Sequence, residues 1–516
     1  MPSLVVFFCI AMPWLNPFSF GPSPAVVPWL FSLACSASIL LWARRVPLAE
    51  LAASAWLSAA SISAAISLLQ YFGGSAAFHP WVNTSDIGEA FANLRQRNQF
   101  ATLTNIGLAA LLWSTSRYCL RPIQTAGTAA SSLRYGRIAA ILAAVLLALG
   151  NAASSSRTGL AQMLLLLALA CVWSRVGGER RRFDQWPVLL AATVAYAIGV
   201  FALPLLAGLD SRASGLIARI HNGELHCLGR LTLWSNVLHL IAQKPWFGWG
   251  WGELGFAHFL TLYPGERFCD ILDNAHNLPL QLAVELGVPL SAAVCIAGVG
   301  LIWRAKPWSE TGATRRLAWS VLALILLHSM LEYPLWYGPF QMALGLSVFL
   351  LWQAGDRSSQ VLTGHSWLPG IASDSAILVL IFAVAYAGWD YRRISQIYQT
   401  TNQRSEAYRE NTLERIGDSW LFRNQVRFAE LTTLTLTPEN ASHVHSLAAD
   451  LLHFSAEPRV VEKLIESATL LGLDQERRFY ELRYQAAFAQ SHALWARGQT
   501  DQEIETSVDE SIKPDP

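Results

Sequence analysis

The stretch WPVLLAATVAYAIGVFALPLLAGL, residues 186–209, decides the fold class, because it has the length of a membrane span and no charged side chain. About 20 consecutive apolar residues cross the hydrocarbon core of a bilayer as a helix. The whole chain of 516 residues is 53% hydrophobic and 14% charged, whereas soluble domains carry roughly 25% charged residues. We therefore expect an all-α, polytopic integral membrane protein.

Apolar runs of spanning length recur along the chain. They cover residues 4–16, 25–43, 48–72, 99–113, 138–153, 159–174, 186–209, 278–303, 317–334, 336–353 and 374–390. The first run lacks the basic n-region and the small-residue cleavage site of a signal peptide, so we interpret it as a span. The sequence thus predicts about 11 transmembrane helices.

Basic residues are concentrated in alternate connections between these runs. The connections that are rich in basic residues carry Arg44, Arg45, Arg117, Arg121, Arg134, Arg137, Arg175, Arg180, Arg181, Arg182, Arg304, Lys306, Arg315 and Arg316. Because Lys and Arg are drawn to cytoplasmic loops, we expect these connections to face the cytoplasm. The loop 72–98, the turn 154–157, the long loop at about 210–275 and the tail after residue 390 are then extracytoplasmic.

The tail differs from the rest of the chain in composition. Over residues 391–516, Arg, Glu and Gln become frequent and apolar residues return at helical spacing, which is typical of amphipathic helices. We expect a membrane domain over residues 1–390 and an α-helical domain of four or five helices over 391–516. A tetratricopeptide-like domain is one interpretation, although no clean 34-residue period is visible.

Two of the seven cysteines lie in the long extracytoplasmic loop, at Cys227 and Cys269. An oxidising compartment permits a disulfide between them, closing a loop of about 40 residues; two free thiols are the alternative. The other five lie in or beside apolar runs and are interpreted as small buried hydrophobes. No Cys or His spacing indicates zinc.

The segment DNAHNLPLQLAVELG, residues 273–287, places His276 where the long loop meets an apolar helix. Pro279 favours a helix start nearby. A helix N-terminus attracts phosphates, and an imidazole can take a proton from an attacking hydroxyl. Taken alone, a histidine at a membrane interface is more often a structural cap or hydrogen-bond donor, and it is the surroundings of His276 that favour a function.

Two arginines lie at comparable boundaries. Arg157 follows a short turn between two apolar runs, and Arg230 begins an amphipathic segment that ends in the Gly/Trp-rich turn 245–252. Snorkelling to the membrane surface is the simplest explanation for such an arginine. Two guanidinium groups are also suited to bidentate binding of a diphosphate.

Two further segments are unusually polar for a membrane protein. NLRQRNQF, residues 93–100, precedes the fourth run, and HSMLEYPLWYGPF, residues 328–340, carries His328 and Glu332 at the end of a run. Ionisable residues within a membrane are usually paired or functional. Trp336 and Tyr337 also fit the aromatic belt of a membrane interface.

The ordered set SRTG (156–159), GR (229–230), PWFGWGWGE (245–253) and NAHNLPLQLAVELG (274–287) resembles a known superfamily. It comprises O-antigen ligases, O-antigen polymerases and PglL-type bacterial O-oligosaccharyltransferases. QRNQ (96–99) and HSMLEYPLWY (328–337) are similar to the last group. The resemblance covers roughly residues 95–345, and the C-terminal domain is similar in placement.

The resemblance implies a GT-C-like glycosyltransferase of the bacterial inner membrane with its active site on the periplasmic face. It would transfer an oligosaccharide from undecaprenyl diphosphate to Ser or Thr of a pilin-like or other periplasmic protein. His276 would be catalytic, and Arg157 and Arg230 would bind the diphosphate. The remaining matched residues would line the acceptor or sugar site: Arg97, Asn98, Asn277, Glu332 and Tyr337.

We expect no cofactor, because fixed arginines can stabilise a diphosphate leaving group as a metal would. Acidic residues that might bind a metal show no compelling spacing: Glu253, Glu266, Asp270 and Asp273. Direct attack with inversion is expected, since no carboxylate nucleophile is evident.

Three other functions stay open at this point. Ligation of O-antigen to lipid A-core and polymerisation of glycan repeats would use the same arginines and histidine. Transport is the third, although no hydropathy repeat or pair of broken helices supports it. We expect membrane lipid but no nucleic acid among the partners.

Overall fold

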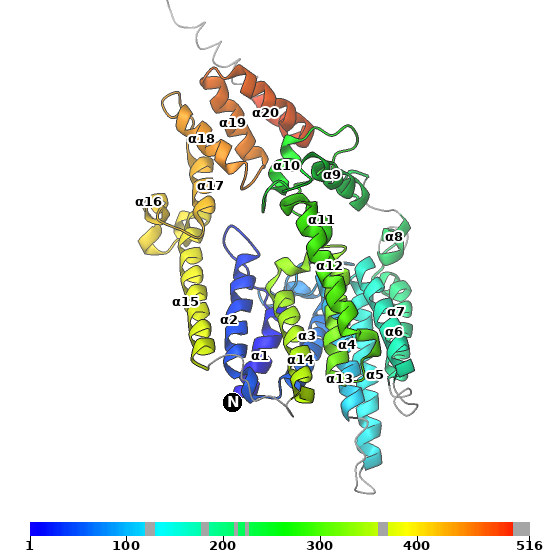
Figure 1. Cartoon of the computed structure of the whole chain (residues 1–516). Helices are drawn as coiled ribbons and strands as arrows, with labels where there is room; N and C mark the ends of the chain where they lie inside the picture. The colour runs from blue at the N-terminus through cyan, green and yellow to red at the C-terminus, as the bar shows by residue number, and fades with distance from the viewer. Residues whose placement is uncertain (119–128, 177–184, 211–214, 222–225, 360–369, 499–516) are drawn as a thin grey trace, which may run out of the picture. The chain divides into compact units, whose positions relative to one another are not determined.

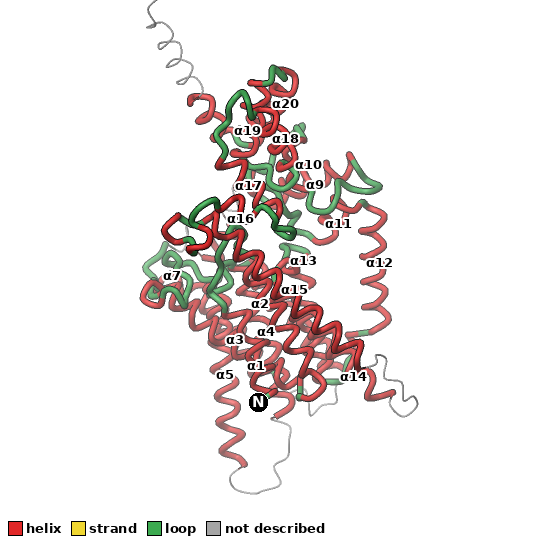
Figure 2. Tube along the Cα trace, turned by 90° about the vertical axis from the view of Figure 1, so that its left-hand side faces the viewer, coloured by secondary structure: helices red, strands yellow, loops and turns green. Residues whose placement is uncertain are grey.

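A computed structural model describes the chain except for residues 119–128, 177–184, 211–214, 222–225, 360–369 and 499–516 (Figure 1). The described residues form α-helices and short 3-10 helices and contain no strand, as Figure 2 shows. The prediction of an all-α protein is confirmed. The 3-10 helices are η1 (Ala43–Arg45), η2 (Ser75–Phe78), η4 (His226–Leu228), η5 (Pro307–Ser309), η6 (Pro334–Trp336), η7 (Ser395–Tyr398), η8 (Thr401–Gln403) and η9 (Glu406–Tyr408).

A long helix lies on each of the apolar runs. These helices are α1 (Pro2–Leu15), α2 (Val26–Trp42), α3 (Leu48–Tyr71), α4 (Arg97–Tyr118), α5 (Ala129–Ala153), α6 (Arg157–Val176), α7 (Trp186–Leu206), α12 (Val288–Ala305), α13 (Ala313–Ser329), α14 (Gly338–Ser359) and α15 (Gly370–Ile394). Within the described residues, 7 helices are long and apolar enough to cross a membrane. The protein is therefore a multi-pass membrane protein by composition, and the count of about 11 spans stays a prediction.

One predicted span is divided. The run 278–303 forms two helices, α11 (Leu278–Leu286) and α12, which are separated by Gly287. Gly287 has φ of 89°, a left-handed conformation that ends α11. The candidate span accordingly begins at Val288 and runs to Ser309.

The chain divides into two compact units. Unit 1 comprises Met1–Gly223 and Gly298–Trp389, and it includes α8 (Gly215–His221) besides most of the long helices. Its centre is built from small side chains: the buried face of α3 carries Ala52, Ala53, Ala55, Ala59, Ala60 and Ala64. Small residues let helix backbones approach closely, which is the usual basis of packing between membrane helices.

The helices of unit 1 have two distinct ends. At one end Arg117 pairs with Glu50 at 3.2 Å, and the indole of Trp173 donates to the carbonyl of Pro307 at 2.7 Å. At the other end Asn98, next to the start of α4, contacts Glu332, which follows α13. The first end therefore gathers basic residues predicted to be cytoplasmic, and the second carries residues predicted for the site.

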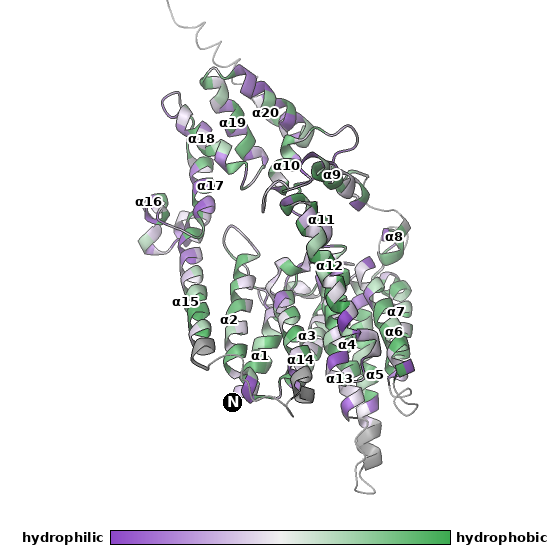
Figure 3. Cartoon of the chain, viewed as in Figure 1, coloured by the Kyte–Doolittle hydropathy of each residue, from purple (hydrophilic) through white to green (hydrophobic). Residues whose placement is uncertain are grey.

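Unit 2 comprises Glu224–Ala297 and Asp390–Pro516. Its helices are α9 (Arg230–Gln243), α10 (Leu254–Leu260), α11, α16 (Thr412–Ile416), α17 (Arg423–Thr433), α18 (Ala441–Leu451), α19 (Pro458–Leu470) and α20 (Asp474–Ala487). Polar and apolar residues alternate along α17–α20, in contrast to the largely apolar helices of unit 1 (Figure 3). This grouping differs from the expected division at residue 390, in which the long loop belonged to the membrane domain.

The loop joins the tail through α10. Phe259 of α10 is buried in one hydrophobic cluster with Leu447, Leu464 and Tyr484. The guanidinium of Arg483 donates to the carbonyl of Leu260 at 2.8 Å. Residues far apart in sequence thus share one core, which amphipathic spacing within the tail could not indicate.

The tail helices form two successive pairs. The first helices of the pairs begin at Arg423 and Pro458, and the second helices begin at Ala441 and Asp474. This repeat of about 34 residues is the period of tetratricopeptide helix pairs. The tetratricopeptide-like interpretation stays a prediction, since the sequence shows no clean repeat.

Candidate functional site

The predicted arginines share one structural position. Arg97, Arg157 and Arg230 are the first residues of α4, α6 and α9, respectively. A helix N-terminus carries N–H groups without intrahelical acceptors and the positive end of the helix dipole. A guanidinium there adds a full charge to a place that already favours phosphate.

In unit 1, Glu332 is the centre of a hydrogen-bonded cluster. The residue is buried, with only 6% of its surface exposed. Oε1 accepts from the side-chain amide of Asn98 at 2.9 Å, and Oε2 accepts from that of Gln96 at 3.2 Å. The QRNQ and HSMLEYPLWY segments are therefore brought together, as the sequence could suggest only by resemblance.

Ser156 connects this cluster to the start of α6. Its hydroxyl donates to Oδ1 of Asn98 at 2.6 Å and accepts from the backbone N–H of Gly159 at 2.9 Å. The second bond is that of a helix N-cap. Since Ser156 precedes Arg157, the cap fixes the backbone from which the Arg157 side chain extends.

Arg219 of α8 was not singled out from the sequence. Its guanidinium donates to the carbonyl of Ser155 at 3.1 Å, so a cation of α8 contacts the turn before Arg157. The signal was weak, because Arg219 lies in a loop with many polar residues.

A buried polar chain extends from this cluster into the helices. The hydroxyl of Thr102 lies 2.9 Å from Nδ1 of His328, and the side chain of Gln162 contacts the same hydroxyl. His328 is fully buried. Buried polar groups are tolerated when hydrogen-bonded, and this chain ties α4, α6 and α13 together.

Two further predicted residues of unit 1 lie beside neighbours of their own. Arg97 pairs with Glu89 at 2.8 Å. The ring of Tyr337 stacks on that of Tyr333, with centroids 5.8 Å apart.

In unit 2, His276 has φ of 51°, a left-handed conformation that is uncommon for residues other than glycine. Its backbone N–H donates to Oδ1 of Asn274 at 2.9 Å. The side chain of Asn277 accepts from the N–H of Leu280 at 3.1 Å and caps α11, in which Pro279 is the second residue. Asn277 is thus a capping residue, and His276 is presented immediately before the helix.

Gln281 and Glu285 of α11 connect His276 to the Gly/Trp-rich turn. Oε1 of Gln281 accepts from the N–H of Ala275 at 2.6 Å. Oε1 of Glu285 accepts from the N–H of Gly252 at 3.0 Å. Glu285 is 3% exposed, and this burial raises the pKa of its carboxyl group. The sequence predicts both residues only as part of an apolar helix.

The two longest motifs pack directly against each other. The N–H of Trp249 donates to the carbonyl of Val284 at 2.8 Å, and that of Gly250 donates to the carbonyl of Glu285 at 3.0 Å. A Cβ atom at Gly248 would lie 2.4 Å from the Glu285 backbone, and one at Gly287 would lie 2.2 Å from the Trp246 carbonyl oxygen. Glycine is required at both positions because the two backbones touch.

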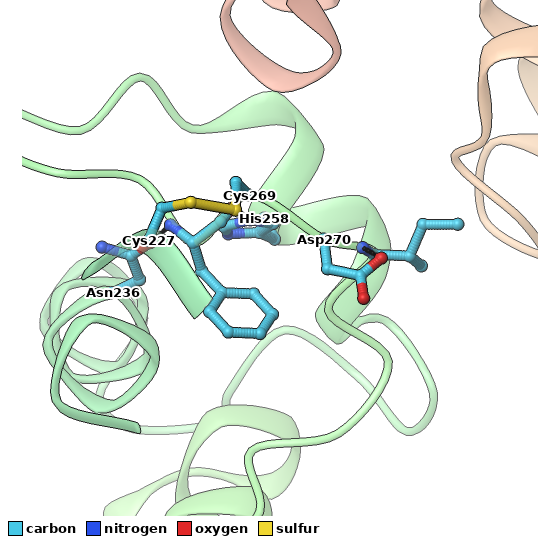
Figure 4. The surroundings of a disulfide bond; sticks show 7 residues. Cys227, Asn236, His258, Cys269 and Asp270 are labelled. Atoms are coloured by element: carbon cyan, nitrogen blue, oxygen red, sulfur yellow. Dashed lines mark hydrogen bonds between the residues drawn. A yellow bond between two sulfur atoms is a disulfide. The ribbon is translucent and has the colours of Figure 1, made fainter. Parts of the chain in front are cut away.

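The long loop is closed by a disulfide between Cys227 and Cys269 (Figure 4). In its surroundings, Asn236 bridges α9 and the loop: its amide donates to the carbonyl of Glu266 at 2.9 Å, and its oxygen accepts from the N–H of Phe268 at 2.8 Å. The loop that precedes His276 is therefore fixed to α9, the helix that begins at Arg230.

His258 supports the same loop. Its Nε2–H donates to the carbonyl of Phe268 at 3.2 Å, and Nδ1 accepts from the hydroxyl of Tyr263 at 2.7 Å. Burial and the nearby charge of Arg267 lower the pKa of His258 to about 3. This histidine is a neutral structural residue.

The acidic residues of the loop are dispersed. Glu253 pairs with His453 at 2.8 Å, and its neighbour Phe256 stacks on the same imidazole at 3.8 Å. Within the part of the chain that the structure describes, no group of three or more His, Cys, Asp or Glu side chains could hold a metal ion.

Three family models match the chain. The one described as O-antigen ligase matches residues 142–295, and the one described as virulence factor membrane-bound polymerase, C-terminal, matches residues 316–502. The one described as protein glycosylation ligase matches residues 90–113. Parts of the chain are thus similar to O-antigen ligases and to protein glycosylation ligases.

Two proteins of Acinetobacter baylyi are similar to this chain. A general O-oligosaccharyltransferase is 27% identical over 227 residues, which are 41% of this chain and 38% of the relative. A ComP-specific O-oligosaccharyltransferase is 25% identical over 149 residues, which are 28% of this chain and 26% of the relative. The aligned part therefore spans well under half of each relative.

The matched ranges cover the candidate residues. Arg157, Arg230 and His276 fall in the O-antigen ligase match, and Arg97 and Asn98 fall in the protein glycosylation ligase match. Glu332 and Tyr337 fall in the third match, which extends through α17–α20.

Proposed function

We propose that this protein is a glycosyltransferase that moves an oligosaccharide from a lipid diphosphate to a hydroxyl of a protein. One observation carries the proposal: Arg157 and Arg230 each begin a helix, and His276 directly precedes the capped start of α11. Two phosphate-binding positions and one proton acceptor are the groups that this reaction needs. The names of the two similar proteins, both O-oligosaccharyltransferases, support a protein acceptor.

The donor in this proposal is an oligosaccharide linked to undecaprenyl diphosphate. Arg157 and Arg230 bind its phosphate oxygens, with the helix N–H groups as additional donors. Negative charge on the diphosphate grows as the bond from the anomeric carbon to the phosphate oxygen breaks. Fixed cations therefore stabilise the transition state more than the bound donor, which raises the rate.

The acceptor is a serine or threonine hydroxyl of a periplasmic protein, with a pilin-like protein as the expected class. Its oxygen forms the new bond to the anomeric carbon, and its proton passes to the imidazole of His276. The leaving group is undecaprenyl diphosphate. Attack opposite to the leaving group inverts the configuration at the anomeric carbon.

We assign the stabilisation of the leaving group to arginines and to no metal or cofactor. Arg219, which donates to the carbonyl of Ser155, adds positive charge beside Arg157. Asn98, Glu332, Arg97, Tyr337 and Asn277 are assigned to shaping the acceptor and sugar sites. Asn277 does so indirectly, since its side chain caps α11.

We further propose that the protein lies in the bacterial inner membrane with Glu332 toward the periplasm. The end of unit 1 that carries Arg117, Arg304 and Arg316 is then cytoplasmic, in agreement with the preference of basic residues for that side. A disulfide between Cys227 and Cys269 suits the oxidising periplasm.

A second candidate is transfer of the glycan to another glycan or to lipid A-core. The matches to models described as O-antigen ligase and membrane-bound polymerase favour it. The proposed groups would be the same, and only the acceptor would differ.

Co-expression decides between these candidates. The chain is produced with a lipid-linked oligosaccharide and a pilin-like acceptor in cells without other ligases, and the location of the sugar is determined. Sugar on the acceptor protein supports our proposal. Sugar on lipid A-core alone, or longer lipid-linked polymers alone, would refute it.

A further inference from the structure

The Gly/Trp-rich turn of unit 2 presents two large aromatic side chains on the surface. Trp246 and Phe247 are consecutive, and 72% and 89% of their surfaces are exposed. Single exposed apolar side chains are common on proteins, whereas contiguous ones mark sites of interaction. Neither residue is among those assigned to glycan transfer, so this aromatic pair needs an explanation of its own.

The backbone beneath the aromatic pair is held in place. The N–H of Gly248 donates to the carbonyl of Lys244 at 3.1 Å. On the other side, a Cβ atom at Gly287 would lie 2.2 Å from the carbonyl oxygen of Trp246. The exposure of the two rings is therefore a property of a packed turn.

The same turn is bonded to the first residue of a candidate membrane span. The N–H of Val288 donates to the carbonyl of Pro245 at 2.8 Å. Val288 begins α12 and the span Val288–Ser309. The apolar residues of a span begin where the hydrocarbon core of the bilayer begins. The aromatic pair is thus attached to the chain at the level of the membrane boundary.

Helix α9, which leads into the turn, has an exposed face without a charged residue. This face carries Leu231, Ser235, Leu238 and Ala242 at helical spacing. Leu231 and Leu238 are 82% and 54% exposed, while Val237 and Leu240 on the other side are buried in the core of the loop. A helix that faces water normally carries charged and polar residues on its outer face.

We propose that Trp246 and Phe247 insert into the bilayer surface and dock the loop of unit 2 on the membrane. The rings lie at the boundary between head groups and acyl chains, where aromatic side chains are favoured. The exposed face of α9 lies along the same surface, as interfacial amphipathic helices do. The bond between Val288 and Pro245 selects lipid as the partner, because a surface joined to the start of a span meets the bilayer.

This docking does not depend on the proposed transfer reaction. It keeps α9, which begins at Arg230, at the membrane surface.

Hydroxyl-radical footprinting of the wild-type full chain tests the docking. The protein is placed in lipid nanodiscs that hold one copy each, and the labelling rates of its side chains are measured by mass spectrometry. Phe479 is the matched reference, because it is 42% exposed and lies on α20, which is at the opposite end of unit 2 from the start of α12 (Figures 1 and 2). We expect slower labelling of Phe247 than of Phe479, although Phe247 is the more exposed of the two in the protein alone. Labelling of Phe247 at least as fast as that of Phe479 would overturn the proposal.

Quenching by spin-labelled lipid identifies what protects Phe247. The fluorescent amino acid acridonylalanine replaces Phe247 in one variant and Phe479 in the matched control, and neither side chain is buried. In the same nanodiscs, a doxyl group near the top of the acyl chain should quench the probe at 247 and leave the probe at 479 bright. Equal quenching of the two probes would refute the docking. Protection of Phe247 without quenching, or only after a protein acceptor is added, would assign the aromatic pair to a protein partner and refute it as well.

Discussion

The side-chain amide of Asn98 donates to Oε1 of Glu332 at 2.9 Å, which joins the start of α4 to the segment that follows α13. The same Asn98 accepts from the hydroxyl of Ser156, the residue before Arg157. The Glu332 carboxylate therefore helps to position, through Asn98, the starts of α4 and α6, which carry Arg97 and Arg157. Its charge state and its two acceptor oxygens are consequently both important.

Glu332→Gln should reduce transfer strongly while the protein remains folded. Glu332 accepts through two oxygens, whereas a glutamine has one acceptor oxygen and one NH₂ group. The side-chain NH₂ of Gln96 or of Asn98 would then face another NH₂ donor. Loss of one hydrogen bond to a charged group costs about 1.5–3 kcal/mol, which corresponds to a roughly 10- to 100-fold effect. The rate of glycan transfer in membranes measures this.

Glu50→Gln serves as the matched control for that experiment. It also removes a carboxylate that contacts a neighbouring helix, but at the opposite end of unit 1. Its transfer rate should stay within twofold of wild type. If both variants retained full activity, Glu332 would have no role in the site.

Gly287→Ala should destabilise unit 2. The added Cβ would lie 2.2 Å from the carbonyl oxygen of Trp246, and the residue has φ of 89°. A non-glycine residue at such a φ costs about 1–3 kcal/mol before any clash is counted. The midpoint of thermal unfolding in detergent should fall by several degrees.

Gly252→Ala separates the cost of the positive φ from the cost of the clash with the Trp246 backbone. Gly252 also has positive φ, 80°, but nothing lies within 4 Å of its added Cβ. Its unfolding midpoint should fall less than that of Gly287→Ala. Equal midpoints would show that the close approach of the two motifs does not contribute.

His258 should make unit 2 less stable in acid. Its pKa is lowered to about 3 in the folded protein from an ordinary value of 6.5, so the unfolded chain binds the proton more tightly between these values. The stability that neutral His258 contributes is fully present above pH 6.5. It is lost as the pH falls below 6.5, because the unfolded chain then binds a proton that the folded protein does not. Between pH 7 and pH 5 the loss is about 2 kcal/mol.

The pH dependence of unfolding in His258→Gln checks this assignment. Glutamine keeps a donor for Phe268 but has no proton to gain. The midpoint of the variant should fall less than that of wild type over the same pH range. Parallel slopes would mean that His258 does not determine the acid sensitivity.

The disulfide should leave Cys227 and Cys269 unmodified when native protein is alkylated, and reduction should expose both. Cys171 is free and is exposed on α6, where the sequence predicted a buried side chain; because α6 is a predicted span, reduced and denatured protein is the control for complete alkylation. Cys227→Ser should lower the stability of the loop by about 2–4 kcal/mol, because the bond restricts the unfolded chain. Two alkylated thiols without reduction would disprove the bond.

The sequence predicted the elements of the fold better than their contacts. Hydropathy placed a helix on every apolar run, since spanning length is a local property. Hydropathy could not predict that the run 278–303 forms two helices. The need for glycine at position 287 comes from the close approach of the Trp246 backbone, which is a tertiary contact. The sequence also could not predict that Phe259 and Leu464 share one hydrophobic core, since the two segments are about 200 residues apart.

The candidate site shows the same contrast. The capping position of Asn277 and the position of His276 before a helix follow from the local sequence, including Pro279. Gln281, Glu285 and Arg219 were missed, because their partners are backbone groups that carry no sequence signal. The sequence relates Arg157 to Glu332 only through the family resemblance.

His276 is the residue on which the proposed reaction depends most directly. Purified wild type and His276→Ala are incubated with an undecaprenyl-diphosphate-linked oligosaccharide and a pilin-like protein, and the mass of that protein is measured. His443→Ala, an exposed histidine of α18, is the control. Our account predicts one added glycan mass with wild type and His443→Ala, and none with His276→Ala. An unmodified acceptor with wild type, or full modification with His276→Ala, would contradict it.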